Sequence, residues 1–390
     1  MKYFLIAGEP SGDQLGAALM AGLVQLDPEA RFVGIGGAGM SAQGLDSLFA
    51  MDELSLMGIW EVLPRYRHLT RRIAQTAAAI AAEAPAALIT IDSPDFCLRV
   101  ARQARAAVPG LRTIHYVAPS VWAWRPGRAR RMAPVIDHVL ALLPFEPPLM
   151  QAAGMSCDFV GHPIAAAPVA GPDEAAAFRA AHDIDPDAPL ILCLPGSRRA
   201  EVGRLAARFD EALMQLRDRV PETRVVVPTV PGVAALVREM SRRWPTRPVV
   251  VEDAADKRAA FAAADAALAA SGTVSLDLAA NRVPMVIGYD MAPVSRLLVW
   301  MLLRTDTVTL VNLVSETRTI PEFLGGACQP APMARALQDV LENPLTRHAQ
   351  LDAMDLTMDR LGKGGEAPGL RAARSVLGAI ARGVREPRSR

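Results

Sequence analysis

Two short segments of this sequence place a glycine beside hydroxyl or guanidinium side chains directly after an apolar run. The first is Gly196, Ser197 and Arg198, and the second is Ser271, Gly272 and Thr273. A glycine lets backbone N–H groups approach a phosphate, the following helix start is electropositive, and an arginine can bind a phosphate with two hydrogen bonds. Alone, each segment is more often a capped turn. Two of them in one predicted sheet favour a diphosphate ligand.

A carboxylate follows the second of these segments by one helical turn. Asp277 can accept hydrogen bonds from the hydroxyls of a sugar at that place. The alternative is that Asp277 is a favourable first-turn charge and Ser271 an N-cap.

Carboxylates also follow two apolar runs in the first half of the chain. The residues concerned are Glu9, Ser11, Gly12 and Asp13 after the first run, and Asp92 and Asp95 after the run 87–91. The first group suits recognition of sugar hydroxyls, and a capped turn is equally compatible with it. Partial desolvation of Asp92 or Asp95 would raise its pKa toward that of a general base. The alternative is that both are structural, with Asp95 as a helix cap and Asp92 bound to backbone. We expect one of the two residues to have the chemical role and the other a structural one.

Residues 34–39 match the pattern G-x-G-x-x-G, which is typical of dinucleotide binding. This match follows the second predicted strand, and Asp52 and Glu53 come too soon for the usual ribose contact. An NAD-dependent oxidoreductase is therefore a minor alternative.

Apolar and aromatic residues precede arginines in a separate stretch, which comprises Met57, Ile59, Trp60, Leu63, Arg65 and Arg67. A second tract, residues 96–136, is free of acidic residues and interleaves Trp122 and Trp124 with arginines. Such tracts suit an anionic lipid surface or single-stranded nucleic acid, and a solvated helix face is the plain alternative.

The amino-acid composition limits which classes of protein and ligand are compatible with these segments. The chain has 390 residues, of which 51% are hydrophobic and 21% charged, and its formal net charge is +1. It is therefore expected to be globular, with no overall field that attracts nucleic acid. The four cysteines form no C-x-x-C pair, so we expect a reducing cytosol and no zinc site. The N-terminal run predicts a strand and not a signal peptide, and no apolar stretch approaches the ~20 residues that span a bilayer.

Short apolar runs alternate with longer amphipathic segments along the chain, which predicts parallel sheets covered by helices on both faces. The stretch 161–172 contains three prolines and two glycines, so the chain is expected to divide there into units 1–164 and 165–345. Residues 346–390 include a further amphipathic helix, whose apolar stripe needs a surface to cover it.

Taken together, the segments after the predicted strands resemble the lipid-A-disaccharide synthase family of inverting glycosyltransferases. The resemblance covers nearly the whole chain and rests on motifs in the family's order: AGEPSGDQLGA, FVGIGGAGM, LMGIWEVLPR, IDSPDF, IHYVAPSVWAWR, LPFE, FVGHP, LPGSRRAEV, ASGTVSLDLA, LVNL and PEFL.

The resemblance implies a GT-B fold: an acceptor and membrane-facing Rossmann-like domain, a UDP-sugar-binding Rossmann-like domain, a cleft between them, and C-terminal helices that pack back on the first domain. It implies transfer of 2,3-diacylglucosamine from its UDP conjugate to 2,3-diacylglucosamine 1-phosphate (lipid X), without metal or other cofactor. Family members are cytoplasmic enzymes peripheral to the inner membrane, some of them homodimers, and nucleic acid is no expected partner.

The resemblance also implies roles for single residues. The triplets at 196–198 and 271–273 would bind the donor diphosphate, with Asp277 on ribose, where the family often has glutamate. Asp92 is the chosen general base and Glu9 the alternative. Asn312 matches a functional asparagine that contacts donor or acceptor. The acceptor would meet Ser11, Gly12, Asp13 and Asp95, and the stretch from Met57 to Arg67 would face the membrane.

Two further classes are kept beside this one. A UDP-sugar epimerase shares the fold and needs no acyl-chain surface. A non-catalytic lipid-binding protein would explain the apolar and basic tracts and leave the two phosphate-type loops without a role.

Overall fold

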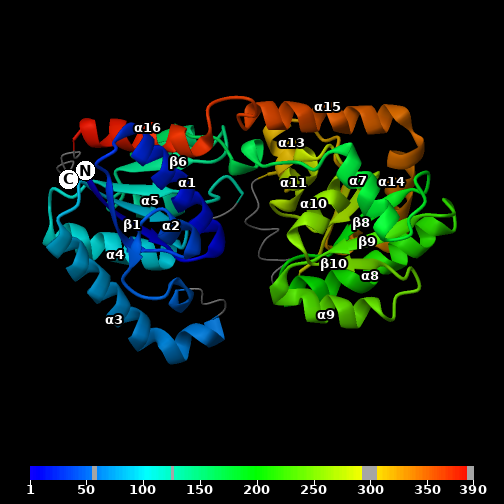
Figure 1. Ribbon diagram of the computed structural model, residues 1–390, viewed down its shortest axis with the longest axis horizontal. Helices are drawn as coiled ribbons and strands as arrows, with labels where there is room; N and C mark the ends of the chain where they lie inside the picture. The colour runs from blue at the N-terminus through cyan, green and yellow to red at the C-terminus, as the bar shows by residue number, and fades with distance from the viewer. Residues whose placement is uncertain (55–58, 124–126, 292–304, 384–390) are drawn as a thin grey trace. The chain divides into compact units, whose positions relative to one another are not determined.

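The computed structural model describes residues 1–54, 59–123, 127–291 and 305–383 (Figure 1). The chain forms two compact units. Unit 1 comprises Met1–Ala166 together with the segment that begins at Gly364, and unit 2 comprises Ala167–Lys363. Each unit has a parallel sheet of its own, as the alternating apolar runs predicted.

The sheet of unit 1 has the strand order β3-β2-β1-β4-β5-β6-β7. Its strands are β1 (Lys2–Ala7), β2 (Arg31–Ile35), β3 (Asp46–Ser47), β4 (Ala87–Ile91), β5 (Thr113–Tyr116), β6 (His138–Ala141) and β7 (Ser156–Phe159). In this register Leu5 of β1 lies opposite Gly34 of β2 and Ile89 of β4. Because the central strands are buried on both faces, they read as continuous apolar runs.

Helices cover both faces of this sheet. They are α1 (Pro10–Leu26), α2 (Ala38–Ala42), α3 (Ile59–Glu83), α4 (Pro94–Ala107), α5 (Gly127–Met132), α6 (Pro147–Ala152) and α16 (Pro368–Ala381), with short 3₁₀ turns at Met51–Glu53 and Pro163–Ala166. Phe4 and Ile6 pack with side chains of α3 and α4 on one face. Tyr3 and Leu5 pack with side chains of α1 and α16 on the other face.

The C-terminal helix α16 packs against α1, the helix nearest the N-terminus (Figure 1). A Cβ on Gly22 would lie 2.6 Å from the carbonyl oxygen of Gly369, and one on Gly369 would lie 2.4 Å from that of Ala18. The two helices can therefore approach this closely only because both positions are glycine. Ser375 of α16 also bonds the ring of His138 on β6, at 2.7 Å.

The sheet of unit 2 has the order β10-β9-β8-β11-β12-β13. Its strands are β8 (Leu190–Leu194), β9 (Arg224–Pro228), β10 (Val249–Val251), β11 (Ala266–Ala269), β12 (Met285–Tyr289) and β13 (Glu322–Leu324). Its helices are α7 (Pro172–Ala181), α8 (Arg199–Arg217), α9 (Pro231–Ser241), α10 (Ala254–Ala263), α11 (Val274–Ala280), α13 (Leu310–Ser315), α14 (Pro330–Glu342) and α15 (Pro344–Arg360), with a 3₁₀ turn at Gly325–Ala327. Phe209 of α8 and Met333 of α14 belong to its core.

The segment 346–390 is divided differently from the sequence expectation. Helix α15 packs on α11 and α13 and so belongs to unit 2, while α16 belongs to unit 1. Gln350 of α15 explains why: its buried amide bonds both the N–H and the carbonyl of Met285 at the start of β12. Only the part that begins at Gly364 returns to the N-terminal unit.

No helix in the described ranges has the length and apolar composition needed to cross a bilayer.

Candidate active site

The two glycine-bearing triplets come together in unit 2. Strands β8 and β11 are neighbours, with Ala269 opposite Leu194, so the loops that follow them leave the same edge of the sheet. Both loops line one cavity of about 490 Å³. Its lining includes all the predicted donor residues: Gly196, Ser197, Arg198, Ser271, Gly272, Thr273 and Asp277. This edge is where open α/β sheets bind ligands.

Both loops depend on a glycine with positive φ. The φ angle is +121° at Gly196 and +151° at Gly272, which other residues adopt only under strain. Beyond Gly196 the chain enters α8 with Arg198 at the N-cap, so the electropositive end of a long helix faces the cavity. A Cβ on Gly272 would meet nothing within 4 Å, so at that position the backbone conformation alone calls for glycine.

Asp277 lies on α11 and lines the same cavity. Burial raises the pKa of its carboxyl to about 6. At neutral pH the group is still mostly ionised, so it can accept hydrogen bonds from the hydroxyls of a ligand.

Sequence reasoning missed two residues that line this cavity, Glu201 and Thr229. The Glu201 carboxylate accepts the N–H groups of Ser197 at 3.3 Å and Arg198 at 3.4 Å. The hydroxyl of Thr229, at the end of β9, is buried and has no hydrogen-bond partner in the described part of the chain. A glutamate three residues after a helix start is a recognisable capping pattern, so Glu201 could have been found from the sequence.

In unit 1, the predicted general base stands on a strained turn. Asp92 and Ser93 follow β4 with φ angles of +51° and +43°, a conformation uncommon for residues other than glycine. A Cβ on Gly8 would lie 2.5 Å from the Ser93 hydroxyl oxygen, so the loop after β1 lies against the loop after β4. Glu9 belongs to that first loop as the N-cap of α1, and Glu9 and Asp92 are both partly exposed. The two candidate bases thus stand on adjoining loops.

The four predicted acceptor residues differ in their surroundings. Ser11 and Asp95 are exposed, and Gly12 is buried in α1. Asp13 is also buried, and its carboxylate accepts three backbone N–H groups at the start of α2: those of Gly37 at 2.7 Å and Gly39 at 2.8 Å within the G-x-G-x-x-G pattern, and that of Met40 at 3.0 Å just after it. This carboxylate therefore holds the turn of residues 37–40. The amides that a dinucleotide would need are bound within the protein.

Asn312 is buried inside unit 2. Its Nδ2 donates to the carbonyl of Ile320 at 2.9 Å and to the Thr307 hydroxyl at 3.3 Å, and its Oδ1 accepts the Ile320 N–H at 3.0 Å. These bonds hold the segment between α13 and β13. A contact with donor or acceptor stays a prediction.

Of the predicted membrane-facing residues, Met57 lies outside the described residues. Ile59, Trp60, Leu63, Arg65 and Arg67 all fall within α3, of which Arg67 is exposed. In the ranges that the structure describes, no group of three or more His, Cys, Asp or Glu side chains could hold a metal ion.

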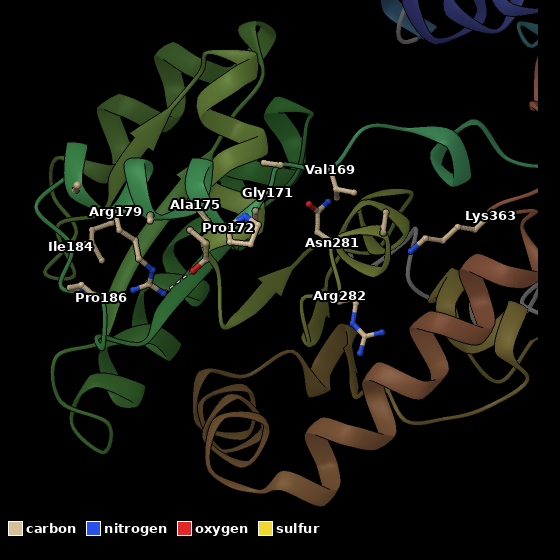
Figure 2. A pocket seen from close by; sticks show the side chains of 16 residues that line it. Val169, Gly171, Pro172, Ala175, Arg179, Ile184, Pro186, Asn281, Arg282 and Lys363 are labelled. Atoms are coloured by element: carbon tan, nitrogen blue, oxygen red, sulfur yellow. Dashed lines mark hydrogen bonds between the residues drawn. The ribbon is translucent and has the colours of Figure 1, made fainter.

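A second cavity, of about 740 Å³, lies elsewhere in unit 2 (Figure 2). Small apolar residues form most of its wall, and Asn281, Arg282 and Lys363 lie at one side. Two of its cations are paired within the protein: Arg179 donates to the carbonyl of Ala263 at 2.7 Å and pairs with Asp265, and Arg282 pairs with Asp355. None of the glycine-bearing loops lines this cavity, so the chemistry points to the smaller one.

Comparisons with known proteins bear on the chain as a whole. The family model for lipid-A-disaccharide synthetase matches residues 3–366. A protein of Ruegeria pomeroyi named lipid-A-disaccharide synthase is 57% identical over 385 residues, which cover 97% of this chain and 95% of that protein. Its namesake in Rhodospirillum centenum is 48% identical over 383 residues, covering 98% and 95%.

Solved structures are similar in fold at much lower identity. The UDP-N-acetylglucosamine 2-epimerase of Neisseria meningitidis bound to UDP-GlcNAc superposes with a TM-score of 0.64. It is 12% identical, with 98% of this chain and 100% of that one covered. A glycosyltransferase of Rickettsia africae gives a TM-score of 0.59 at 12% identity and 98% coverage of both chains. These likenesses show the GT-B type of fold.

Proposed function

The chain belongs to the lipid-A-disaccharide synthetase family. From this membership we propose that the glycine-bearing loops of unit 2 bind the donor and that the loops after β1 and β4 in unit 1 bind and activate the acceptor. The enzyme is a lipid-A-disaccharide synthase. It transfers 2,3-diacylglucosamine from the UDP conjugate to lipid X. The products are UDP and the β-1′,6-linked disaccharide 1-phosphate.

One observation carries the assignment of the donor site: two glycine-bearing loops and Asp277 line a single cavity. The donor diphosphate lies on the N–H groups at residues 196–198 and 271–273, and Asp277 accepts from the ribose hydroxyls. Negative charge grows on the departing UDP as its bond to the sugar breaks. The guanidinium of Arg198 offsets this charge, so it stabilises the transition state more than the bound substrate.

The transfer needs a base at the acceptor. The 6-hydroxyl oxygen of lipid X attacks C1 of the donor sugar from the face opposite the diphosphate, the new C–O bond forms, and the old one breaks toward UDP. The hydroxyl proton passes to a carboxylate within hydrogen-bond reach. Asp92 takes this proton in our proposal, and its place on a strained turn at a strand end supports the choice. Glu9, on the adjoining loop, is the alternative.

The other residues have supporting roles in the proposal. Ser11, Gly12, Asp13 and Asp95 surround or shape the acceptor site, and Asn312 contacts the donor or the acceptor. The stretch from Met57 to Arg67 meets the anionic inner face of the cytoplasmic membrane, where the acylated substrates reside. A homodimer is compatible with these roles.

The epimerase alternative has one observation in its favour, the similarity in fold to UDP-N-acetylglucosamine 2-epimerases. At 12% identity this likeness concerns the fold alone. An epimerase would bind UDP-sugars and would form no disaccharide, so product analysis separates the two functions.

The deciding experiment incubates purified protein with UDP-2,3-diacylglucosamine and lipid X in detergent and EDTA, and detects the disaccharide 1-phosphate by mass spectrometry. Asp92→Asn and Arg198→Ala are run beside the unchanged protein. Asp187→Asn, in the exposed loop before β8, is the matched control. We expect product from the unchanged protein and the control, and its loss in both other variants. Full activity of Asp92→Asn would transfer the base role to Glu9. UDP binding without any disaccharide, over several acyl-chain lengths, would refute the transferase.

A further inference from the structure

The carboxylate of Glu201 lies within the loop that we assign to the donor diphosphate. One of its oxygens, Oε2, accepts the N–H groups of Ser197 and Arg198 at 3.3 and 3.4 Å. The other, Oε1, pairs with the guanidinium of Arg198 at 2.9 Å. An anionic group of this chain thus contacts the same backbone N–H groups and the same guanidinium that a phosphate would use.

The fit of Glu201 in the loop is close. A Cβ on Gly196 would lie 2.6 Å from the Cβ of Glu201 and 2.7 Å from its Oε2, so the glycine leaves the space that this side chain occupies. The Glu201 side chain is 16% exposed, whereas that of Arg198 is 65% exposed. The carboxylate is therefore held in the loop, and the guanidinium can swing toward a ligand in the cavity that both residues line.

We propose that Glu201 is an affinity-determining residue of the donor site, because its carboxylate occupies the N–H and guanidinium groups that the donor diphosphate takes over. This inference rests on the proposed function, since it takes the cavity as the UDP-sugar site. A carboxylate and a phosphate oxygen cannot share these donors without repulsion. The donor therefore displaces Glu201 and recruits Arg198 when it binds.

The same exchange acts in reverse after transfer. UDP keeps both phosphates, so it would dissociate slowly from a loop with free N–H groups. When the Glu201 carboxylate binds these N–H groups and the Arg198 guanidinium again, it replaces the contacts that UDP loses. Glu201 thus weakens the binding of donor and product alike and shortens the time that UDP stays bound.

The chain offers a matched control for this idea. Glu174 stands three residues after the N-cap of α7 and accepts the Gly171 N–H at 2.9 Å, so it caps its helix in the way that Glu201 caps α8. Glu174 does not line the donor cavity. Glu174→Gln and Glu201→Gln remove the same charge from the same kind of helix cap, and differ in whether a diphosphate site is next to it.

The test is the binding of UDP and of uridine to the full chain by isothermal titration calorimetry, with the melting temperature of each variant measured alongside. We expect Glu201→Gln to bind UDP roughly three- to tenfold more tightly, since one like charge is gone and the amide still fits the loop. The affinity for uridine, which has no phosphate, should stay unchanged in this variant. Glu174→Gln should leave both affinities as they are.

A plain capping role predicts something different: a lower melting temperature and weaker or unchanged UDP binding in Glu201→Gln. That outcome, or an equal change for UDP and uridine, would overturn the inference and leave the donor site intact. If the unchanged protein does not bind UDP at all, the proposed donor site and the inference fail together.

Discussion

Replacing Asp13 by asparagine separates a structural from an acceptor-binding role for this carboxylate. Both of its oxygens are occupied: Oδ1 accepts the N–H groups of Gly37 and Met40, and Oδ2 accepts that of Gly39. Asparagine has the same shape, with one oxygen and one NH₂ group. Whichever way its amide turns, at least one backbone N–H of the turn then faces another donor.

The cost follows from these contacts. The variant loses one charge-assisted hydrogen bond, worth about 1.5–3 kcal/mol, and leaves a backbone N–H without an acceptor. Gly37 and Gly39 are partly exposed, so water recovers some of the loss. We therefore expect the free energy that opens the turn at 37–40 to fall by about 2 kcal/mol, which accelerates amide exchange there roughly 30-fold.

Hydrogen exchange read by mass spectrometry measures this directly, on peptides that cover residues 37–42. Asp95→Asn is the control, because Asp95 is exposed in the first turn of α4 and no side-chain cap bond forms at that helix start. It should change neither exchange nor stability by more than a few tenths of a kcal/mol. Unchanged exchange in Asp13→Asn, together with a raised KM for lipid X, would refute the reasoning and give Asp13 to the acceptor.

Three further predictions follow from single sites. Gly196→Ala should abolish tight UDP binding in a calorimetric titration, because its Cβ would collide with Glu201 and its φ is +121°, while Gly203→Ala on the open side of α8 should bind normally. Burial raises the pKa of Glu146 to about 7, so ionisation of this carboxyl destabilises the fold as pH rises from 4.5 through 7. In urea unfolding, Glu146→Gln should therefore have a free energy of unfolding up to about 3 kcal/mol above that of the unchanged protein above pH 8, and an equal one below pH 4. Gly369→Ala should lower the melting temperature by several degrees, since its Cβ meets the backbone of Ala18.

The cavity that the two glycine-bearing loops line could be predicted from the sequence because the signals of these loops are local. Each is an apolar run, a glycine and a polar residue within a few positions, and parallel strands bring their carboxyl ends to one edge. The partners of Asp13 and Asn312 could not be predicted in this way. Asp13 bonds a turn more than 20 residues away, and Asn312 bonds Ile320 across an irregular segment. A buried carboxylate that caps a turn and one that awaits a ligand have the same local pattern.

The C-terminal segment shows a second limit of the same kind. An apolar stripe on a helix indicates that some surface covers it, and the glycines at 362–365 indicate a break. Neither says which unit provides the surface. The choice is made by contacts distant in sequence, such as Gln350 on Met285 for α15 and Gly369 against Gly22 for α16.

Backbone strain supports the place of the acceptor chemistry independently of any motif. Ala84, Asp183, Arg282 and Glu316 have positive φ just after helices, where such a residue is an ordinary way to end a helix. Asp92, Ser93 and Val117 are different, because they follow the neighbouring strands β4 and β5. Val117 is β-branched, and a left-handed conformation there costs of order 1–3 kcal/mol. A glycine would remove that cost at any of the three positions. The chain thus holds Ser93 and Val117 in strained backbone conformations at the ends of the two strands that meet at Asp92, and a helix cap alone would not need this strain.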